Sequence, residues 1–398
     1  MNSGTVPAEQ SVRNRCLILG LLFVCRTGLG FQFQTLGSVS SSLVSELGFS
    51  YAEIGTLIGL FMLPGLVLAL PVGYAGRHAS DLSLVVTGLL MLSAGGAIGS
   101  IAPGFGLLAL GRIAAGAGFV FSTIYFAKMV ADWFTGKELA TAMGILVMSW
   151  PFGIAMGQIG QVWIAAHFDW HLVFLVAALH CMLGAAALAL LYRAPHPAKP
   201  PPAAGQVGLT RSEFVLTLLA AMVWALFNAG YIVYLSFAPR VLMSGGYEAS
   251  DAAAVISLAS WVMIFSAAIC GQIADRTGKR DQIIYVCAVV AVLTLLALRE
   301  TSMAVALSLL FGLVGAAPAG VIMALTAEAM APQRRAFGMG VFFSIYFVFL
   351  TVAPPIAGWL FDRRGDPFAP IVFAASLFAS AAFANWVFRL AQRKLKVS

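Results

Sequence analysis

Two long apolar segments are joined by the polar run Gly271-Gln-Ile-Ala-Asp275-Arg276-Thr-Gly278-Lys279-Arg280, in a chain with only 10% charged residues. Glycine permits a tight turn between two helices. Arginine and lysine in such a loop hold it on the cytoplasmic side of a membrane. An aspartate at a helix end can pair with nearby cations or cap the next helix. The run therefore predicts a short cytoplasmic loop between two membrane-spanning helices.

The rest of the chain has the composition of a polytopic membrane protein. Its 398 residues are 61% hydrophobic and have a mean hydropathy of +0.93, whereas a soluble domain is about 45–50% apolar. The net charge of +7 comes mostly from cations between apolar segments, so we expect a lipid bilayer and not nucleic acid as partner. The five cysteines show no paired spacing. No disulfide, metal site or cofactor is therefore predicted.

Twelve apolar segments are long enough to span a bilayer, which needs about 20 residues. A proline-rich interruption lies near the middle of the chain and cannot form helix. The sequence therefore predicts an all-α protein with an N-terminal six-helix bundle (1–192), a cytoplasmic linker (193–212) and a C-terminal six-helix bundle (213–398). The predicted spans lie near 16–38, 52–75, 82–102, 106–130, 138–165, 171–192, 213–238, 250–273, 282–299, 303–327, 336–361 and 368–388.

The distribution of cations predicts the orientation. With the N-terminus in the cytoplasm, seventeen lysines and arginines fall on the cytoplasmic side. Four fall on the other side, namely Arg240, Arg299, Arg363 and Arg364. This asymmetry predicts that both termini are cytoplasmic. We expect a monomer in a bacterial inner membrane.

The polar run resembles the loop signature of the major facilitator superfamily of secondary transporters. A second match lies in 111–118, where Arg112 is followed by spaced glycines as in the fourth span of that superfamily. The resemblance implies two six-helix pseudo-repeats that alternate access to a central site. It also implies a gating role for the loop. In the first-half copy of the loop, at 73–81, either Arg77 stands where the aspartate is expected or the aspartate has been lost, so a symmetric gate in both halves is not expected. The predicted gating residues are Gly271, Asp275, Arg276, Gly278 and Arg280.

Two arginines, Arg26 and Arg112, lie inside predicted spans. A charge at this depth costs about 2.5–3.5 kcal/mol on insertion scales, so it usually faces the bundle interior and serves a function. We predict that Arg26 faces a substrate. For Arg112 the sequence leaves two roles open, because its guanidinium could contact substrate or only bond carbonyls of neighbouring helices.

Several polar and aromatic residues accompany these arginines. Pro151 should bend the fifth span, and the segment around it resembles the cyanate and nitrate/nitrite permease-like branches of the superfamily. An aromatic residue in a membrane helix is more often packing than a ligand contact. With this alternative open, the predicted substrate-binding residues are Arg26, Gln34, Arg112, Thr123, Trp150, Asn228, Tyr231, Trp261 and Tyr346.

All sixteen acidic residues can be placed in loops or at span ends. A cavity that holds two arginines and no carboxylate is positive and should attract anions. A guanidinium also matches the oxygens of carboxylate or nitrate with two parallel hydrogen bonds. The sequence therefore predicts a transporter of a small anion, such as a monocarboxylate or a cyanate- or nitrate-like ion, by proton symport or anion exchange.

Two other functions remain open. The large aromatic inventory, with 29 Phe, 8 Trp and 9 Tyr, would also suit an exporter of amphipathic or drug-like compounds. A membrane sensor that binds without transporting is the second alternative, although no segment is long enough for an appended signalling domain. An enzyme is not expected, because the loops carry no nucleophile–base set, metal spacing or phosphate-binding loop.

Overall fold

The computed structural model describes residues 8–76, 78–134, 137–194, 208–331 and 334–395, and these residues form helices and no strand. Twelve of the helices or helix groups are long and apolar enough to cross a membrane, which confirms the twelve predicted spans. The elements in chain order are α1 (Ala8–Leu47), α2 (Tyr51–Leu60), α3 (Leu63–Ala75), α4 (Asp81–Gly99), α5 (Phe105–Trp133), α6 (Lys137–His167), α7 (Trp170–Leu191), α8 (Arg211–Ser244), α9 (Ala249–Thr277), α10 (Arg280–Ala297), η1 (Thr301–Met303), α11 (Ala304–Leu310), η2 (Phe311–Gly315), α12 (Ala319–Met323), α13 (Leu325–Ala329), α14 (Arg335–Arg364) and α15 (Ala369–Lys394).

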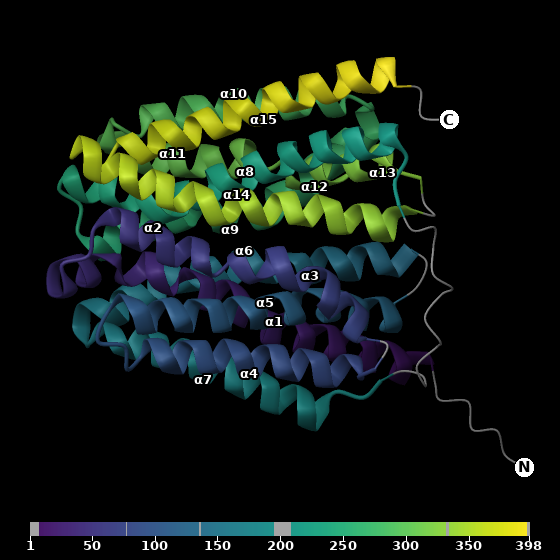
Figure 1. Cartoon of the computed structure of the whole chain (residues 1–398), viewed down its shortest axis with the longest axis horizontal. Helices are drawn as coiled ribbons and strands as arrows, with labels where there is room; N and C mark the ends of the chain where they lie inside the picture. Colours follow the sequence, from purple (N-terminus) through teal and green to yellow (C-terminus); the bar gives the residue numbers. More distant parts are fainter. Residues whose placement is uncertain (1–7, 77, 135–136, 195–207, 332–333, 396–398) are drawn as a thin grey trace, which may run out of the picture.

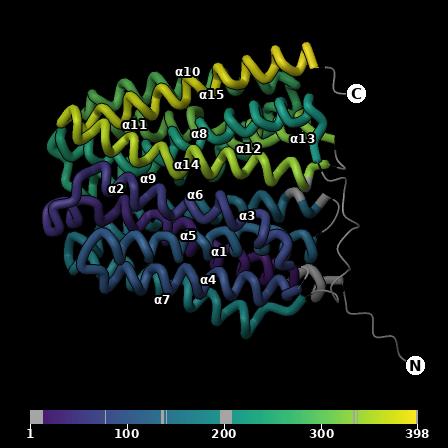
Figure 2. Tube along the Cα trace, in the orientation of Figure 1, coloured from purple at the N-terminus to yellow at the C-terminus, as the bar shows by residue number. Residues whose placement is uncertain are grey.

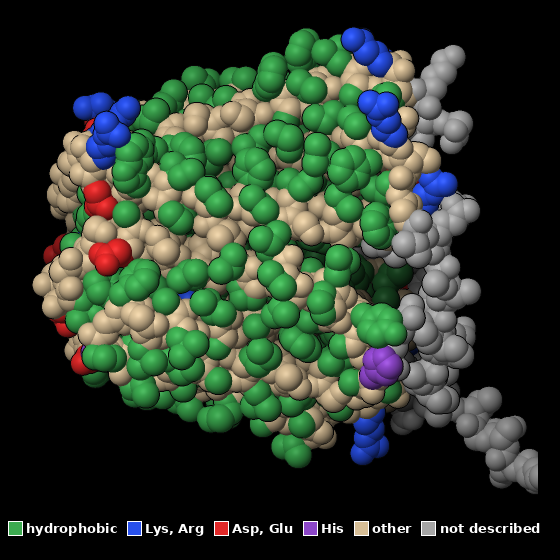
Figure 3. Space-filling view, in the orientation of Figure 1, with side chains coloured by type: hydrophobic (Ala, Val, Ile, Leu, Met, Phe, Trp, Pro, Cys, Tyr) green, Lys and Arg blue, Asp and Glu red, His purple; other side chains and the backbone are tan. Residues whose placement is uncertain are grey.

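The helices run side by side along the long axis of the molecule (Figures 1 and 2). Helices α1 to α7 occupy the lower part of the view and α8 to α15 the upper part. The start of α1 and the end of α15 lie at the same end of the bundle, which we call the terminal end; the opposite end is the distal end. Apolar side chains cover the flank between them, and charged side chains gather at the two ends (Figure 3). This distribution suits a bilayer around the flank.

Helices α1 and α8 extend beyond the predicted spans, to Leu47 and Ser244. In α1 the additional turns are rich in serine, yet two of the hydroxyls bond the helix's own backbone. Ser40 Oγ donates to the carbonyl of Gly37 at 2.9 Å and Ser45 Oγ to that of Ser42 at 3.3 Å. Because these hydroxyls find a partner one turn back, the polar residues do not end the helix.

The tenth span was predicted as one helix over 303–327, but it crosses as a series of short pieces. The chain passes from α11 into a single π-helical turn, η2, and then into α12 and α13. Gly312 packs so closely on α9 that an added Cβ would lie 2.4 Å from the carbonyl oxygen of Ala259. Pro318 follows, without a backbone N–H to continue the ladder. Interrupted helices of this kind are frequent at functional sites.

The two parts of the bundle meet mainly where α2 and α3 pack on α14 and where α6 packs on α9. At the distal end α2 and α14 approach so closely that a Cβ at Gly358 would lie 1.9 Å from the carbonyl oxygen of Tyr51. The carboxylate of Asp362 accepts hydrogen bonds from the backbone N–H groups of Tyr51 and Ala52, at 2.9 and 2.7 Å. The distal end is thereby closed.

The predicted linker lies mostly outside the described residues, since 195–207 are not part of the described chain. The helix after it begins at Arg211, two residues before the predicted bundle boundary. Thr210 caps that helix. Its hydroxyl accepts a hydrogen bond from the backbone N–H of Glu213, and the Glu213 carboxylate accepts one from the backbone N–H of Thr210. This reciprocal arrangement satisfies two of the free donors at a helix start.

Candidate functional site

Arg26 lies on α1 in the middle of the bundle and is 9% exposed. Its Nη1 donates to the carbonyl oxygen of Leu146 and to Ser149 Oγ on α6, both at 2.8 Å. Its Nε is buried and finds no hydrogen-bond acceptor in the described part of the chain. In a planar guanidinium the Nε–H and one Nη2–H point the same way, so this edge can hold two oxygens of one ligand.

An aromatic cluster includes Trp150, the residue after Ser149, and extends to Phe33, seven residues beyond Arg26 on α1. Phe33, Phe119 and Trp150, from α1, α5 and α6, pack with ring centroids 5.1 to 5.4 Å apart. Thr123 lies one turn beyond Phe119, and its hydroxyl is buried without a hydrogen-bond partner among the described residues. The structure therefore places the predicted residues Trp150 and Thr123 near one aromatic cluster. Pro151 lies inside α6, which continues past it to His167.

The second half reaches this region through Trp261 on α9. Its ring packs edge-on against Phe152 of α6 at 5.1 Å, and Phe152 packs against Phe23 of α1 at 5.5 Å. Phe23 lies three residues before Arg26, on a neighbouring position of the same helix. A continuous line of rings therefore connects the two halves and ends at Phe23, about one turn before Arg26 on α1.

Arg112 is arranged differently, since its donors are taken up by neighbouring helices. Its Nε bonds the carbonyl of Leu57 at 3.2 Å, and its Nη atoms bond the carbonyls of Gln32 and Phe33 at 3.0 and 3.3 Å. It is 2% exposed, and the ring of Phe61 lies 4.5 Å beneath its Cζ. Of the two roles left open by the sequence, this geometry favours the one in which Arg112 ties α5 to α1 and α2.

The remaining predicted residues of the second half do not form one cluster. Asn228 donates to the carbonyl of Trp224 at 2.8 Å, and the ring of Tyr346 lies 6.3 Å from that of Trp224. Tyr231 is buried, and its hydroxyl lies 2.9 Å from Ser260 Oγ. Its polar atom already has a partner inside the second half, so Tyr231 is less suited to bind a ligand than Tyr346.

Gln34 lies too far along α1 to share a small ligand with Arg26. Eight residues of helix separate them, which corresponds to about 12 Å. Gln34 instead lines a small cavity of about 20 Å³ between the halves at the distal end. The same cavity is lined by Gln158 and Arg240, neither of which is among the residues predicted to bind substrate. Their proximity depends on how α6 and α8 pack, and no local pattern signals it.

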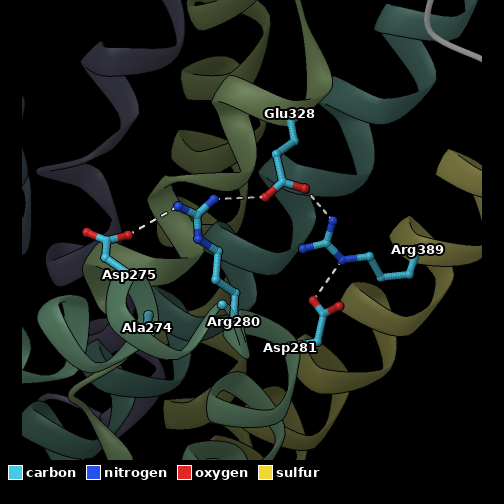
Figure 4. A pocket seen from close by; sticks show the side chains of 7 residues that line it. Ala274, Asp275, Arg280, Asp281, Glu328 and Arg389 are labelled. Carbon is cyan, nitrogen blue, oxygen red and sulfur yellow. Dashed lines mark hydrogen bonds and ion pairs between the residues drawn. The ribbon is translucent and has the colours of Figure 1, made fainter.

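The predicted gating loop forms a charged cluster at the terminal end (Figure 4). The guanidinium of Arg280 bonds Asp275 at 3.1 Å and Glu328 at 3.3 Å, and Arg389 pairs with Glu328 and with Asp281 at 2.7 Å. These residues line a depression of about 360 Å³. They come from α9, α10, α13 and α15, so the cluster belongs entirely to the second half.

The other predicted gating residues lie around the same turn. Gly278 ends α9 with a φ of 67°, a left-handed conformation that favours glycine. Arg276 is exposed, and no atom would contact a Cβ at Gly271 within 4 Å. Arg77, in the first-half copy of the loop, lies outside the described residues.

A bundle of twelve apolar helices of membrane-spanning length, with Arg26 and Arg112 buried between them, is the architecture of an integral membrane protein. The family profile described as Major Facilitator Superfamily matches residues 22–299, and a second profile, described as MFS_1 like family, matches residues 219–396. The chain belongs to the Major Facilitator Superfamily.

Solved structures with the same fold include two further transporters. A bacterial homolog of the human lysosomal transporter Spinster, in an inward-facing and occupied conformation, superposes with a TM-score of 0.79 at 16% identity, over 99% of this chain and 100% of that one. A mutant of the nucleoside transporter NupG superposes with a TM-score of 0.72 at 14% identity, over 97% of this chain and 99% of that one. At these identities the likeness concerns the fold alone.

One curated relative is Solute carrier family 49 member A3 of Xenopus tropicalis, which is 28% identical over 266 residues. The match covers 61% of this chain and 53% of that protein, so it spans about half of the relative's length. None of these relatives belongs by name to the cyanate or nitrate/nitrite branches. That narrower resemblance therefore stays a prediction.

Proposed function

We propose that this transporter moves a small anion by alternating access of two six-helix halves, and that Arg26 binds the anion. The observation that carries the proposal is the unpaired Nε edge of Arg26, which is buried and held in place by Leu146 and Ser149. Leaving a charged donor buried without an acceptor costs about 1–3 kcal/mol or more. An anion with two oxygens, such as a carboxylate or nitrate, would supply the missing acceptors.

The aromatic cluster of Phe33, Phe119 and Trp150, which begins next to the Arg26 partner Ser149, supports the same proposal. Rings that exclude water lower the local dielectric, so the attraction between a guanidinium and an anion is stronger there than in water. Arg112 adds positive charge further along the bundle, where its donors bond the carbonyls of Gln32, Phe33 and Leu57. Whether the anion moves with a proton or in exchange for another anion would be read from the response of transport to an imposed pH gradient.

The test is uptake of nitrate, formate and cyanate into liposomes that contain the purified protein. We expect Arg26→Gln to abolish uptake and Arg26→Lys to retain only part of it, because an ammonium lacks the two-pronged edge. Arg363→Gln is the matched control, since Arg363 lies exposed at the distal end and stacks on Trp359 at 5.0 Å. Wild-type uptake by folded Arg26→Gln would rule out the proposed site.

A second candidate is export of a larger amphipathic compound. The line of rings formed by Phe23, Phe152 and Trp261 beside Arg26 favours it, because aromatic rings offer a large apolar contact area. The same liposomes separate the two candidates. Transport that is inhibited by lipophilic compounds and unaffected by small anions would favour the exporter.

A further inference from the structure

The small cavity at the distal end lies where four helices of the two halves meet. Gln34 and Ser40 on α1, Gln158 on α6, and Ser236 and Arg240 on α8 are among its lining residues, and the start of α9 completes it. Its volume of about 20 Å³ is enough for one water molecule. In the closed distal end it is thus too small for a carboxylate or nitrate, and it would widen when the halves separate.

Polar groups of this cavity are left without partners. Gln158 is 1% exposed, and neither its Nε2 nor its Oε1 is hydrogen-bonded within the described part of the chain. Buried side-chain amides normally satisfy both atoms, so an exception calls for an explanation. An oxygen-rich ligand would accept from Nε2, and the amide could turn to suit it.

Arg240 gives the cavity its charge. Its Nη2 donates to Ser40 Oγ at 3.1 Å, and its Cζ lies 5.3 Å from the ring centroid of Tyr51. No carboxylate pairs with it in the described residues, and none lines the cavity. An arginine without a counter-charge in a polar cavity attracts anions.

Both contacts of Arg240 cross from the second half to the first, at the end where Asp362 joins α14 to α2. A ligand that takes the guanidinium must compete with Ser40 and Tyr51. Binding would thus remove a contact that holds the distal end closed. A ligand can shift a conformational equilibrium only through such a difference between the two states.

We propose that this cavity is a second anion site, where a small oxyanion or carboxylate docks from the distal side and, by drawing Arg240 away from Ser40 and Tyr51, opens the distal end. Gln34 and Gln158 supply neutral donors to the same ligand. The proposal rests on the anionic substrate proposed above but uses a different arginine. Arg26, about 21 Å from Ser40 along α1, would receive the anion afterwards.

The experiment follows how easily a cysteine in the cavity is labelled. Ser236→Cys is introduced in a Cys16→Ser background, because Cys16 is exposed and the other four cysteines are buried. A hydrophilic maleimide is added to the protein in detergent with sodium nitrate, sodium formate or no added anion. Nitrate or formate should raise the labelling rate about fivefold or more, and Arg26→Gln should not remove this response.

Arg240→Gln should abolish the response and raise labelling without any anion, since the contacts across the halves are lost. Arg299→Gln is the matched control, because Arg299 stacks on Phe368 at 5.6 Å within the second half, and it should respond as the parent does. An unchanged response in folded Arg240→Gln would overturn this inference. If the Ser236→Cys parent does not respond to anions while uptake still requires Arg26, this inference is overturned and the proposed function stands. If the parent does not respond and uptake does not require Arg26, the second anion site and the proposed function are both overturned.

Discussion

Replacing Gly358 by valine should force the distal end of the bundle open. The new Cβ would lie 1.9 Å from the carbonyl oxygen of Tyr51, whereas ordinary contacts begin at 3.4 Å. The two backbones must therefore move apart by about 1.5 Å. A neighbouring backbone cannot turn aside as a flexible side chain can, so α2 and α14 have to separate as helices.

The displacement can be converted into a free energy. Asp362 lies one turn beyond Gly358 and accepts from Tyr51 N and Ala52 N at 2.9 and 2.7 Å. An added 1.5 Å takes both contacts beyond hydrogen-bond range. Hydrogen bonds to a charged group contribute about 1.5–3 kcal/mol each, and Asp362 is exposed, so the lower value applies. The closed state would lose about 3 kcal/mol, which shifts the equilibrium about a hundredfold.

The same cysteine in the distal cavity, Ser236→Cys with Cys16→Ser, reports this shift as faster labelling in detergent. Gly160→Val is the matched control, because Gly160 lies on α6 near the same end and a Cβ there has nothing within 4 Å. Asp362→Asn should give a smaller increase, since it weakens the hydrogen bonds without the steric clash. If Gly358→Val and Gly160→Val are labelled at the same rate while both are folded, the distal contact of α2 with α14 does not hold that end closed.

Three further predictions concern buried and surface charges. Arg112→Gln should lower stability by about 3 kcal/mol or more, because three backbone carbonyls lose a charged donor, and the melting temperature in detergent measures this. Asp275→Asn should change stability by less than about 1 kcal/mol, since its ion pair with Arg280 is largely exposed, but should slow uptake in liposomes if the loop acts as a gate. Glu213→Gln should destabilise by about 3 kcal/mol in thermal unfolding, because the 5% exposed Glu213 carboxylate pairs with Arg334 at 2.7 Å; no loss of melting temperature there would show that this ion pair is not a structural tie.

The fold could be predicted from the sequence because hydropathy indicates which segments span a bilayer and the charge of the loops indicates on which side each loop lies. The early end predicted for the first span has a physical cause. Serines such as Ser40 lower the local hydropathy, yet the hydroxyl of Ser40 bonds a carbonyl one turn back and the helix continues. The broken tenth span was missed for a different reason. Leu, Val, Gly and Ala around Gly312 keep its hydropathy high, whereas the π turn depends on the close approach to α9.

The candidate site was harder to predict because helix packing decides which of the buried polar residues keep unpaired hydrogen-bonding groups. Arg26 and Arg112 are alike in the sequence, as single arginines in apolar spans. They differ in their neighbours: Arg112 bonds backbone carbonyls of α1 and α2, whereas Arg26 finds acceptors for one nitrogen only among the described residues. Arg240 was assigned to the outside by counting charges. Its role at the interface depends on Tyr51 and Ser40, some two hundred residues away in the chain.

The two ends of the bundle explain what the signature loop can do. Among the described residues, every hydrogen bond between the halves lies at the distal end, through Asp362 and Arg240. The cluster around Asp275 lies at the terminal end and bonds only its own half. Alternating access requires the distal contacts to be replaced by contacts of similar strength at the terminal end. Gly271, whose Cβ position is open, and the largely exposed Asp275 are available for such contacts. We therefore expect the loop to stabilise the opposite state, in which the terminal end is closed, and the contribution of Asp275 to appear in transport rates and not in the stability of the present state.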